Sequence, residues 1–206
     1  MVMYKNDLFN RWAGRYDPAS GASLYPFDGY EKILSAARSL VMKPENSLLL
    51  DIGTGPGALV KPLYDAGAKV HTLDFSAKML ERARTAMPGA VLHCHDFSLG
   101  LPSSLSGVVF DYITAGYALH HLEDGAKVEF LSSLRPHMKK GGGIIVADVS
   151  FETAAARQAC RTAAGEGWDT GEYYMALDEM KPGLSAAGFE VQYWQLSSCG
   201  GLLFLL

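Results

Sequence analysis

The stretch Leu48-Leu49-Leu50-Asp51-Ile52-Gly53-Thr54-Gly55-Pro56-Gly57 decides the fold of this chain. Its first half is an apolar run typical of a strand buried on both faces of a sheet. Asp51 places a carboxylate near the end of that strand, and three glycines follow at alternate positions. Glycine allows sharp turning and lets a ligand lie against bare backbone. With a helix expected from Ala58 to about Ala66, the pattern predicts a ligand-binding turn; a tight turn without a ligand is the simpler alternative.

The composition indicates an ordinary globular protein and predicts one domain over residues 1–206. Of its 206 residues, 49% are hydrophobic and 19% are charged, and the formal net charge is −4. The only adjacent basic pair is Lys139-Lys140. A nucleic-acid binder is expected to carry a basic stripe, so a nucleic-acid partner is disfavoured.

Neither a signal peptide nor a membrane-spanning run is visible in the sequence. The cysteines are few, odd in number and widely spaced, at Cys94, Cys160 and Cys199. This usage argues against a disulfide framework and favours a reducing cytoplasm. The sequence does not decide between a monomer and a homodimer.

Residues 1–45 precede the ligand turn and read as two helices. Apolar residues at helical spacing predict one helix over residues 4–13, and a second pattern runs from Pro26 to Val41. These helices either pack on the sheet edge or form a helical lid that brings Trp12 and Tyr16 over a bound ligand. Residues 46–206 are expected to form the ligand-binding α/β core.

Strands and helices alternate after the turn. Strands are expected over residues 69–73, 90–95, 108–115 and 144–149, with helices between them. The helix before the last of these strands is expected to extend through Met138 and to end at Gly141–Gly143. This alternation is typical of a parallel sheet covered on both faces. The tail predicts helices over residues 154–164 and 182–187, then two strands joined by a loop short enough to require antiparallel pairing.

Four acids fall at strand ends: Asp51, Asp74, Asp96 and Asp148. Ligands of open α/β sheets bind at the carboxyl ends of strands, so the first three acids should ring one crevice. Asp74 can accept hydrogen bonds from both hydroxyls of a ribose, Asp96 can accept one from an exocyclic amine, and Phe97 offers an apolar edge to a purine. These roles fit an adenosine.

Two cofactors contain adenosine, and Gly53-x-Gly55-x-x-Ala58 also fits the dinucleotide fingerprint of NAD proteins. The carboxylate of Asp51 would repel the negatively charged pyrophosphate of NAD, whereas it would attract the ammonium of a methionine group. Asp96-Phe97 has no role in the dinucleotide pattern, and the tail shows no substrate domain. The sequence therefore favours S-adenosylmethionine (SAM) over NAD.

Together, residues 48–57, Asp74, Asp96-Phe97 and residues 111–122 resemble class I SAM-dependent methyltransferases, particularly small bacterial enzymes that act on small molecules. The resemblance implies a Rossmann-like, doubly wound, mostly parallel seven-stranded sheet with an antiparallel C-terminal edge hairpin. It implies a small-molecule methyl acceptor and S-adenosylhomocysteine (SAH) as product.

The resemblance also assigns roles to individual residues. Gly53, Gly55 and Gly57 would border the methionine part of SAM, Asp74 would hold its ribose, and Asp96 and Phe97 its adenine. Ala115 and Gly116 would lie beneath the sulfonium and the ribose. The remaining expected cofactor contacts are Asp51, Thr54, Phe75, Met79, Trp12 and Tyr16. Methyltransferases of DNA amines carry Asn or Asp, then Pro-Pro and an aromatic after the fourth strand, but this chain has Ala115-Gly116-Tyr117-Ala118.

Residues 93–96 contain residue types that bind metal ions. On a strand, however, His93 and His95 share one face while Cys94 points to the other, so no metal site is expected there. If the methyl acceptor must lose a proton, the candidate general bases are Tyr117, His120, His121 and Asp148. A SAM- or nucleotide-binding protein without catalysis and an NAD-dependent oxidoreductase are the alternative functions.

Overall fold

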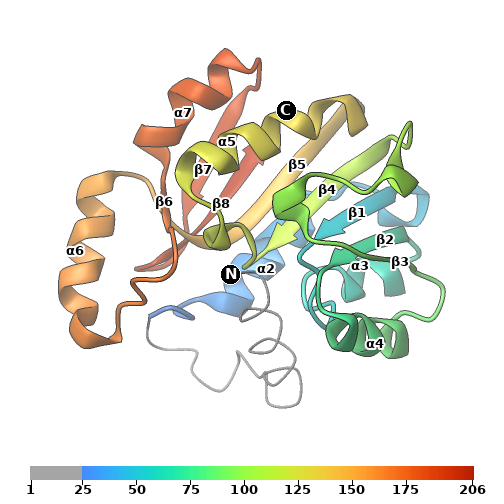
Figure 1. Cartoon of the computed structure of the whole chain (residues 1–206), viewed down its shortest axis with the longest axis horizontal. Coiled ribbons are helices and arrows are strands. Elements are labelled where there is room, and N and C mark those ends of the chain that lie inside the picture. The colour runs from blue at the N-terminus through green and yellow to red at the C-terminus, as the bar shows by residue number, and fades with distance from the viewer. Residues whose placement is uncertain (1–24) are drawn as a thin grey trace.

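The computed structural model describes residues 25–206 (Figure 1). The expected helix over residues 4–13 and the expected cofactor contacts Trp12 and Tyr16 lie outside the described residues. The lid hypothesis for them stays a prediction.

One mixed sheet forms the centre of the protein. Its strands are β1 (Leu48–Ile52), β2 (Lys69–Asp74), β3 (Val91–Cys94), β4 (Phe110–Gly116), β5 (Met138–Phe151), β6 (Met175–Ala176), β7 (Val191–Gln195) and β8 (Gly200–Leu205). Seven strands follow the order β3-β2-β1-β4-β5-β8-β7, and the two-residue β6 pairs with β5. Only β8 runs against its neighbours, since it pairs antiparallel with both β5 and β7. The predicted fold class and C-terminal hairpin are confirmed; β6 was not predicted.

Helices cover both faces of the sheet (Figure 1). The α-helices are α2 (Tyr30–Ser39), α3 (Lys61–Asp65), α4 (Ala77–Ala86), α5 (Asp124–Ser133), α6 (Ala154–Ala164) and α7 (Leu177–Ala186). Short 3-10 turns include η3 (Phe97–Leu99) and η5 (Leu119–His121). No helix among residues 25–206 has the length and apolar character needed to cross a membrane.

Two hydrophobic clusters show how β1 unites these layers. Leu49 belongs to the cluster that contains residues of α2, α3 and α4, whereas Leu50 and Ile52 belong to the cluster that contains residues of α5 and α7. Successive side chains of a strand point to opposite faces, so a strand that is apolar throughout must be covered on both. Each of these three side chains is at most 1% exposed, so their full burial contributes about 1.5–3 kcal/mol apiece.

The predicted end of a helix at Gly141–Gly143 is wrong, because these glycines lie inside β5. A Cβ added to Gly142 would lie 2.3 Å from the carbonyl oxygen of Asp111, and one added to Gly143 would lie 2.2 Å from the ring of Phe204. These glycines allow neighbouring strands to approach across the sheet, which is a second reason for glycine besides stopping a helix.

Four predicted helix boundaries also move. The helix α2 begins at Tyr30, four residues after the predicted start at Pro26. The helix α5 ends at Ser133, and Met138 starts β5 instead of completing the helix. The helix α7 begins at Leu177, directly after β6, and carries Pro182 in its interior, although proline favours the first helical turn. The helix α3 begins at Lys61, three residues after the predicted start.

Candidate functional site

The turn after β1 depends on glycine for two different reasons. Gly53, Gly55 and Gly57 all have positive φ angles, of 62°, 54° and 97°. At Gly53 a Cβ would lie 2.4 Å from that of Ala118, whereas at Gly55 no atom of residues 25–206 lies within 4 Å of the added Cβ. Gly53 therefore lets β1 and the segment after β4 meet, and Gly55 leaves its side of the turn open to a ligand.

The amides of this turn are engaged within the protein. The N–H groups of Gly53 and Thr54 donate to the Leu73 carbonyl at 2.8 and 3.2 Å, and that of Gly57 donates to the Thr54 carbonyl at 2.9 Å. The Gly55 N–H donates to the Asp74 carboxylate at 2.7 Å. A pyrophosphate cradle needs such N–H groups directed at the ligand, and here four of them have partners in the protein.

Two carboxylates lie beside the turn. Asp74, at the end of β2, is 6% exposed and accepts from Gly55 N and, at 2.8 Å, from Ser76 N. Asp51 is 1% exposed and accepts from the Thr114 hydroxyl at 2.6 Å. Burial raises the pKa of both carboxyls, and that of Asp51 reaches about 7 although the Thr114 hydroxyl opposes the shift. Either group would be stabilised in its charged form by a cation or a hydroxyl donor.

A cavity opens at the carboxyl ends of β1, β2 and β4, where the rule for open α/β sheets places ligands. Nine of the expected cofactor contacts line it: Asp51, Gly53, Thr54, Gly55, Asp74, Phe75, Met79, Phe97 and Gly116. They come from β1, its turn, the end of β2, the start of α4, η3 and the end of β4. The structure therefore brings together segments spread over more than sixty residues of chain.

Three other expected cofactor contacts do not line the cavity. Gly57 faces the methyl group of Met87, and Ala115 is buried in the core beneath the sheet end. The Asp96 carboxylate caps η3 by accepting from Ser98 N at 2.9 Å. An acid after a strand can satisfy the next turn as readily as a ligand, and the sequence pattern does not distinguish these uses.

Sequence reasoning missed several lining residues, namely Tyr30, Leu34, Pro56, Ala58, Leu59 and Ala118. Tyr30 and Leu34 lie on the apolar stripe of α2, and the same stripe packs α2 on the sheet. The periodicity gives the buried face but not which of its members reach a cavity. Residues next to the glycine turn and after β4 could have been found from their neighbours in sequence.

Tyr117 follows β4 with a φ of 51°, one of two positive values among the described residues other than glycine. Such a conformation is uncommon for a bulky residue and marks strain that is often found at functional sites. Its N–H donates to the Ala147 carbonyl at 2.7 Å, and its ring lies 4.6 Å from that of Tyr30. Tyr117 is thereby held at the cavity wall between the ends of β4 and β5 and α2.

His120 and Asp148 form a buried pair behind this wall. Nδ1 of His120 lies 2.6 Å from Asp148 Oδ1, and the carboxylate also accepts from Leu119 N, His120 N and Val149 N. Burial alone would lower the pKa of His120, but Asp148 raises it; burial would raise the pKa of Asp148, but His120 lowers it. Neither residue lines the cavity, so these two candidate bases are placed behind it.

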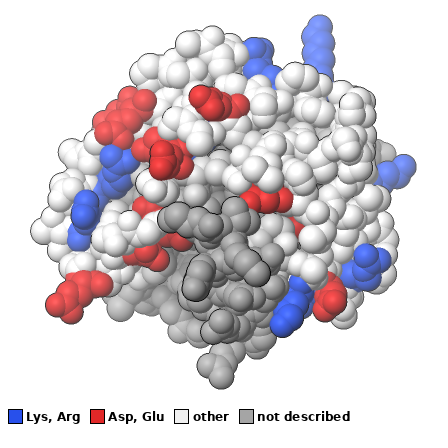
Figure 2. Space-filling model, in the orientation of Figure 1, with Lys and Arg blue, Asp and Glu red and all other residues white. Residues whose placement is uncertain are grey.

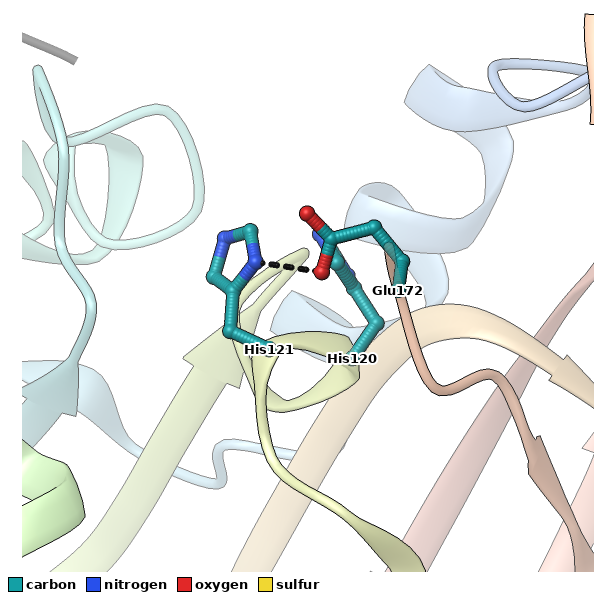
Figure 3. A group of neighbouring side chains, drawn as sticks. All are labelled: His120, His121 and Glu172. Atoms are coloured by element: carbon teal, nitrogen blue, oxygen red, sulfur yellow. Dashed lines mark hydrogen bonds and ion pairs between the residues drawn. The ribbon is translucent and has the colours of Figure 1, made fainter. Parts of the chain in front are cut away.

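His121 does line the cavity and is paired with Glu172, which sequence reasoning missed. Its Nδ1 lies 2.7 Å from Glu172 Oε2 (Figure 3). Burial lowers the pKa of His121 although Glu172 opposes that shift. Figure 3 shows both imidazoles of η5 and the Glu172 carboxylate pointing to the same side. No sequence signal links residue 172 to residue 121, because 51 positions separate them.

Surface charge offers no basic track on the face drawn in Figure 2. There the described Lys and Arg side chains are scattered, mostly near the outline of the molecule, and do not form a continuous stripe, and acidic side chains stand among them. Double-stranded nucleic acid is bound through many clustered phosphate contacts.

Comparisons with known families and sequences all find methyltransferases. Residues 50–144 match the family described as a methyltransferase domain. The chain is 33% identical to an uncharacterized methyltransferase of Geobacillus kaustophilus over 92% of this chain and 90% of that protein. It is 30% identical to the uncharacterized methyltransferase YrrT of Bacillus subtilis over 91% of each chain.

Solved structures share the fold at lower identity. The structure of DhpI with SAM and HEP superposes with a TM-score of 0.73 at 17% identity, covering 100% of this chain and 97% of that one. Magnesium protoporphyrin IX methyltransferase from Synechocystis, with bound SAH, gives 0.73 at 18% identity, covering 100% and 99%.

Proposed function

Because the chain belongs to the methyltransferase family, we propose that it transfers a methyl group from SAM to a small-molecule acceptor. One observation carries the cofactor assignment: Asp74, Asp51 and the open side of the turn at Gly55 meet in one cavity at the strand ends. The solved neighbours that hold SAM or SAH support it.

The carboxylate of Asp74 is our proposed ribose contact. A carboxylate has about four acceptor positions, and the amides of Gly55 and Ser76 use one on each oxygen. Each oxygen therefore keeps a position for a ribose hydroxyl, and the two amides fix the direction in which those positions point. Such preorganisation lowers the ordering cost of binding.

Asp51 is our proposed partner for the ammonium of the methionine group. It is nearly inaccessible and is held by Thr114, so an ion pair there would be shielded from water. Phe97, Phe75 and Met79 supply apolar surface for adenine on the other side of the cavity. Gly116 leaves room beneath the sulfonium, where a Cβ would already crowd Leu59 at 3.2 Å.

The chemistry then needs orientation more than activation. The sulfonium is already activated, because the group that leaves it is the neutral sulfide SAH. Methyl transfer is an in-line displacement: the lone pair of the acceptor forms the new bond to the methyl carbon, and the electron pair of the broken C–S bond stays on sulfur. The protein holds the two reactants in line and keeps water away. Tyr117 and His121 line the cavity on the side of η5, so we propose that the acceptor enters there.

An NAD-dependent oxidoreductase is disfavoured by the engaged amides of the turn as well as by family membership. A SAM-binding protein without catalysis would need the same cofactor cavity. It would not need His121 and Glu172 beside that cavity, so the acceptor side favours an enzyme. The three free cysteines agree with the reducing cytoplasm that we propose as its location.

Calorimetry with SAM, SAH and NAD tests the cofactor. We expect SAM and SAH to bind and NAD to bind more weakly than either; tighter binding of NAD would overturn the assignment. Incubation with methyl-labelled SAM and a panel of small alcohols, thiols and amines then tests turnover. If SAH binds but no member of the panel is methylated, the result would favour a SAM-binding protein without catalysis.

A further inference from the structure

We propose that His120, His121 and Glu172 bind one divalent metal ion of the zinc class at the acceptor side of the cavity. Each residue offers one ligand atom, and these atoms all lie within 4.8 Å of one another. Among residues 25–206 they form the one such group of three. Figure 3 shows the two imidazoles and the carboxylate directed to the same side of η5.

The residue types indicate the kind of ion. Two imidazoles and one carboxylate form a ligand set known from catalytic zinc sites and from open iron sites. Mg²⁺ and Ca²⁺ prefer oxygen ligands alone, so two histidines disfavour them. Three protein ligands leave at least one coordination position for a further molecule, as in catalytic metal sites rather than closed structural ones.

Asp148 supplies the outer contact that metal-binding histidines usually have. It lies 2.6 Å from Nδ1 of His120 and is fully buried, with three backbone amides donating to it. A carboxylate at Nδ1 fixes the ring orientation and tautomer and leaves Nε2 as the ligand atom. The proposed site therefore has a rigid wall on its buried side.

The segment that carries Glu172 is also tied down next to this wall. Tyr173 N donates to the carbonyl of His120 at 2.8 Å, and the carbonyl of Tyr173 accepts from Lys127. The next residue, Tyr174, is 5% exposed and lies with its ring 5.9 Å from that of His120. These contacts bring a residue far along the chain to the two histidines of η5.

The pair His121–Glu172 needs only a small change to accept the ion. Its atoms are 2.7 Å apart, whereas two ligands of zinc at about 2.0–2.1 Å in a tetrahedral site stand roughly 3.4 Å apart. A rotation of the Glu172 side chain supplies that difference. The charges also balance, because the carboxylates of Glu172 and Asp148 together neutralise a divalent ion close to the cationic sulfonium.

The metal site would add a way to activate the methyl acceptor, and this role of the metal rests on the proposed methyltransferase function. A metal ion beside the cavity would bind an acceptor through oxygen or sulfur and favour its deprotonated form, with the proton released to solvent. The acceptor lone pair would then attack the methyl group, and the C–S bond would break to give SAH. Alcohol, phenol, acid or thiol acceptors are therefore favoured over amines.

Titration of tag-free, EDTA-treated protein with ZnCl₂ tests the site, because a histidine tag would bind the metal itself. We expect about one equivalent to bind to the wild-type chain, and Co²⁺ to give a visible absorption spectrum with nitrogen and oxygen ligands. Glu172→Gln should weaken zinc binding at least tenfold, since loss of even an outer contact costs about 10–100-fold.

The matched control is Glu166→Gln, the same change at an exposed residue of the same segment. His93→Asn is the second control, because Nδ1 of His71 lies 3.1 Å from Nε2 of His93 and this pair could bind zinc by itself. Both controls should keep the wild-type zinc affinity.

Absence of saturable zinc binding, or equal binding by Glu172→Gln and Glu166→Gln, would overturn the proposal. SAH binding, measured on the same samples, separates this outcome from failure of the proposed function. The affinity for SAH should be the same in Glu172→Gln as in the wild-type chain. If the wild-type chain does not bind SAH at all, the cofactor assignment fails instead of the metal site.

Discussion

The two sides of the cavity are built in different ways. On the proposed cofactor side, the turn after β1 is shaped by Gly53 and Gly55 and is fixed to β2 through Asp74. The proposed acceptor side is built around side chains, with His121 lining the cavity, His120 behind it on η5, and Glu172 from a segment 51 residues after His121. The glycine turn is a contiguous stretch of sequence, whereas the cluster of two histidines and a glutamate exists only once the chain has folded.

This difference determines what each side tolerates. Few residues other than glycine adopt a positive φ without strain, so the glycine turn on the proposed cofactor side is sensitive to single substitutions. A side-chain cluster can exchange members without disturbing the sheet, so the acceptor side can change its chemistry while the cofactor stays the same. The same fold can thus carry different methyl acceptors.

Gly53→Ala should cause the largest loss. The new Cβ would lie 2.4 Å from that of Ala118, and the backbone would keep a φ of 62°. Left-handed conformation costs roughly 1–2 kcal/mol, and overpacking typically costs 1–3 kcal/mol more, so the free energy of unfolding should fall by about 2–5 kcal/mol. Denaturant unfolding measures it.

Gly55→Ala is the matched control, since its φ is similar but its Cβ would meet no atom of the described part of the chain within 4 Å. Its stability should fall by only about 1–2 kcal/mol, while SAH binding suffers because the open side of the turn is filled. Equal losses of stability in both variants would contradict the different purposes that we assign to the two glycines.

Asp74→Ala should weaken SAH binding by at least about tenfold. Each hydrogen bond to a charged group contributes about 1.5–3 kcal/mol, and 1.4 kcal/mol corresponds to one decade in affinity. Asp96→Ala should change the affinity much less, because its carboxylate caps η3 and does not line the cavity. Calorimetry on both variants decides which acid holds the cofactor, and equal effects would remove the distinction.

The sequence predicted the sheet, its hairpin and nine cavity residues because these follow from local patterns. Hydrophobic runs, glycine spacing and acids at strand ends are all visible within a few residues of one another. It failed at Gly141–Gly143 and at Pro182, where tertiary contacts override the local rule that glycine and proline end or begin helices. It also missed Glu172, since nothing in a single sequence reports which distant loop returns to the strand ends.

Lys127→Met should affect the acceptor side alone. Lys127 is fully buried and donates to the carbonyl of Tyr173 and to Asp124, so it anchors the segment that carries Glu172. The variant leaves the Tyr173 carbonyl without this partner, which costs about 1–3 kcal/mol of stability. SAH affinity should stay within about twofold of wild type. A large loss of SAH affinity would show that the two sides are not independent.

Asp51 should make both the stability and the SAM affinity of the protein depend on pH. Its pKa of about 7 in the folded chain lies above the ordinary value of 3.8, so the folded state holds a proton that the unfolded state releases between these values. The stability of the ligand-free protein should therefore fall as the pH rises from about 4 to 7 and then level off. The ammonium of SAM favours the charged carboxylate, so SAM affinity should change in the opposite direction.

At pH 6 the charged form of Asp51 is present in about one molecule in ten, and at pH 7 in about half of the molecules, so SAM should bind up to about fivefold more weakly at pH 6 than at pH 7. Calorimetry between pH 5.5 and about 7 keeps most of the SAM ammonium protonated, because its pKa is near that of other α-amino groups. Asp51→Asn should bind more weakly and lose this pH dependence, because its amide does not titrate. If the slope persists in Asp51→Asn, another group controls it, and the proposed contact between Asp51 and the methionine ammonium fails.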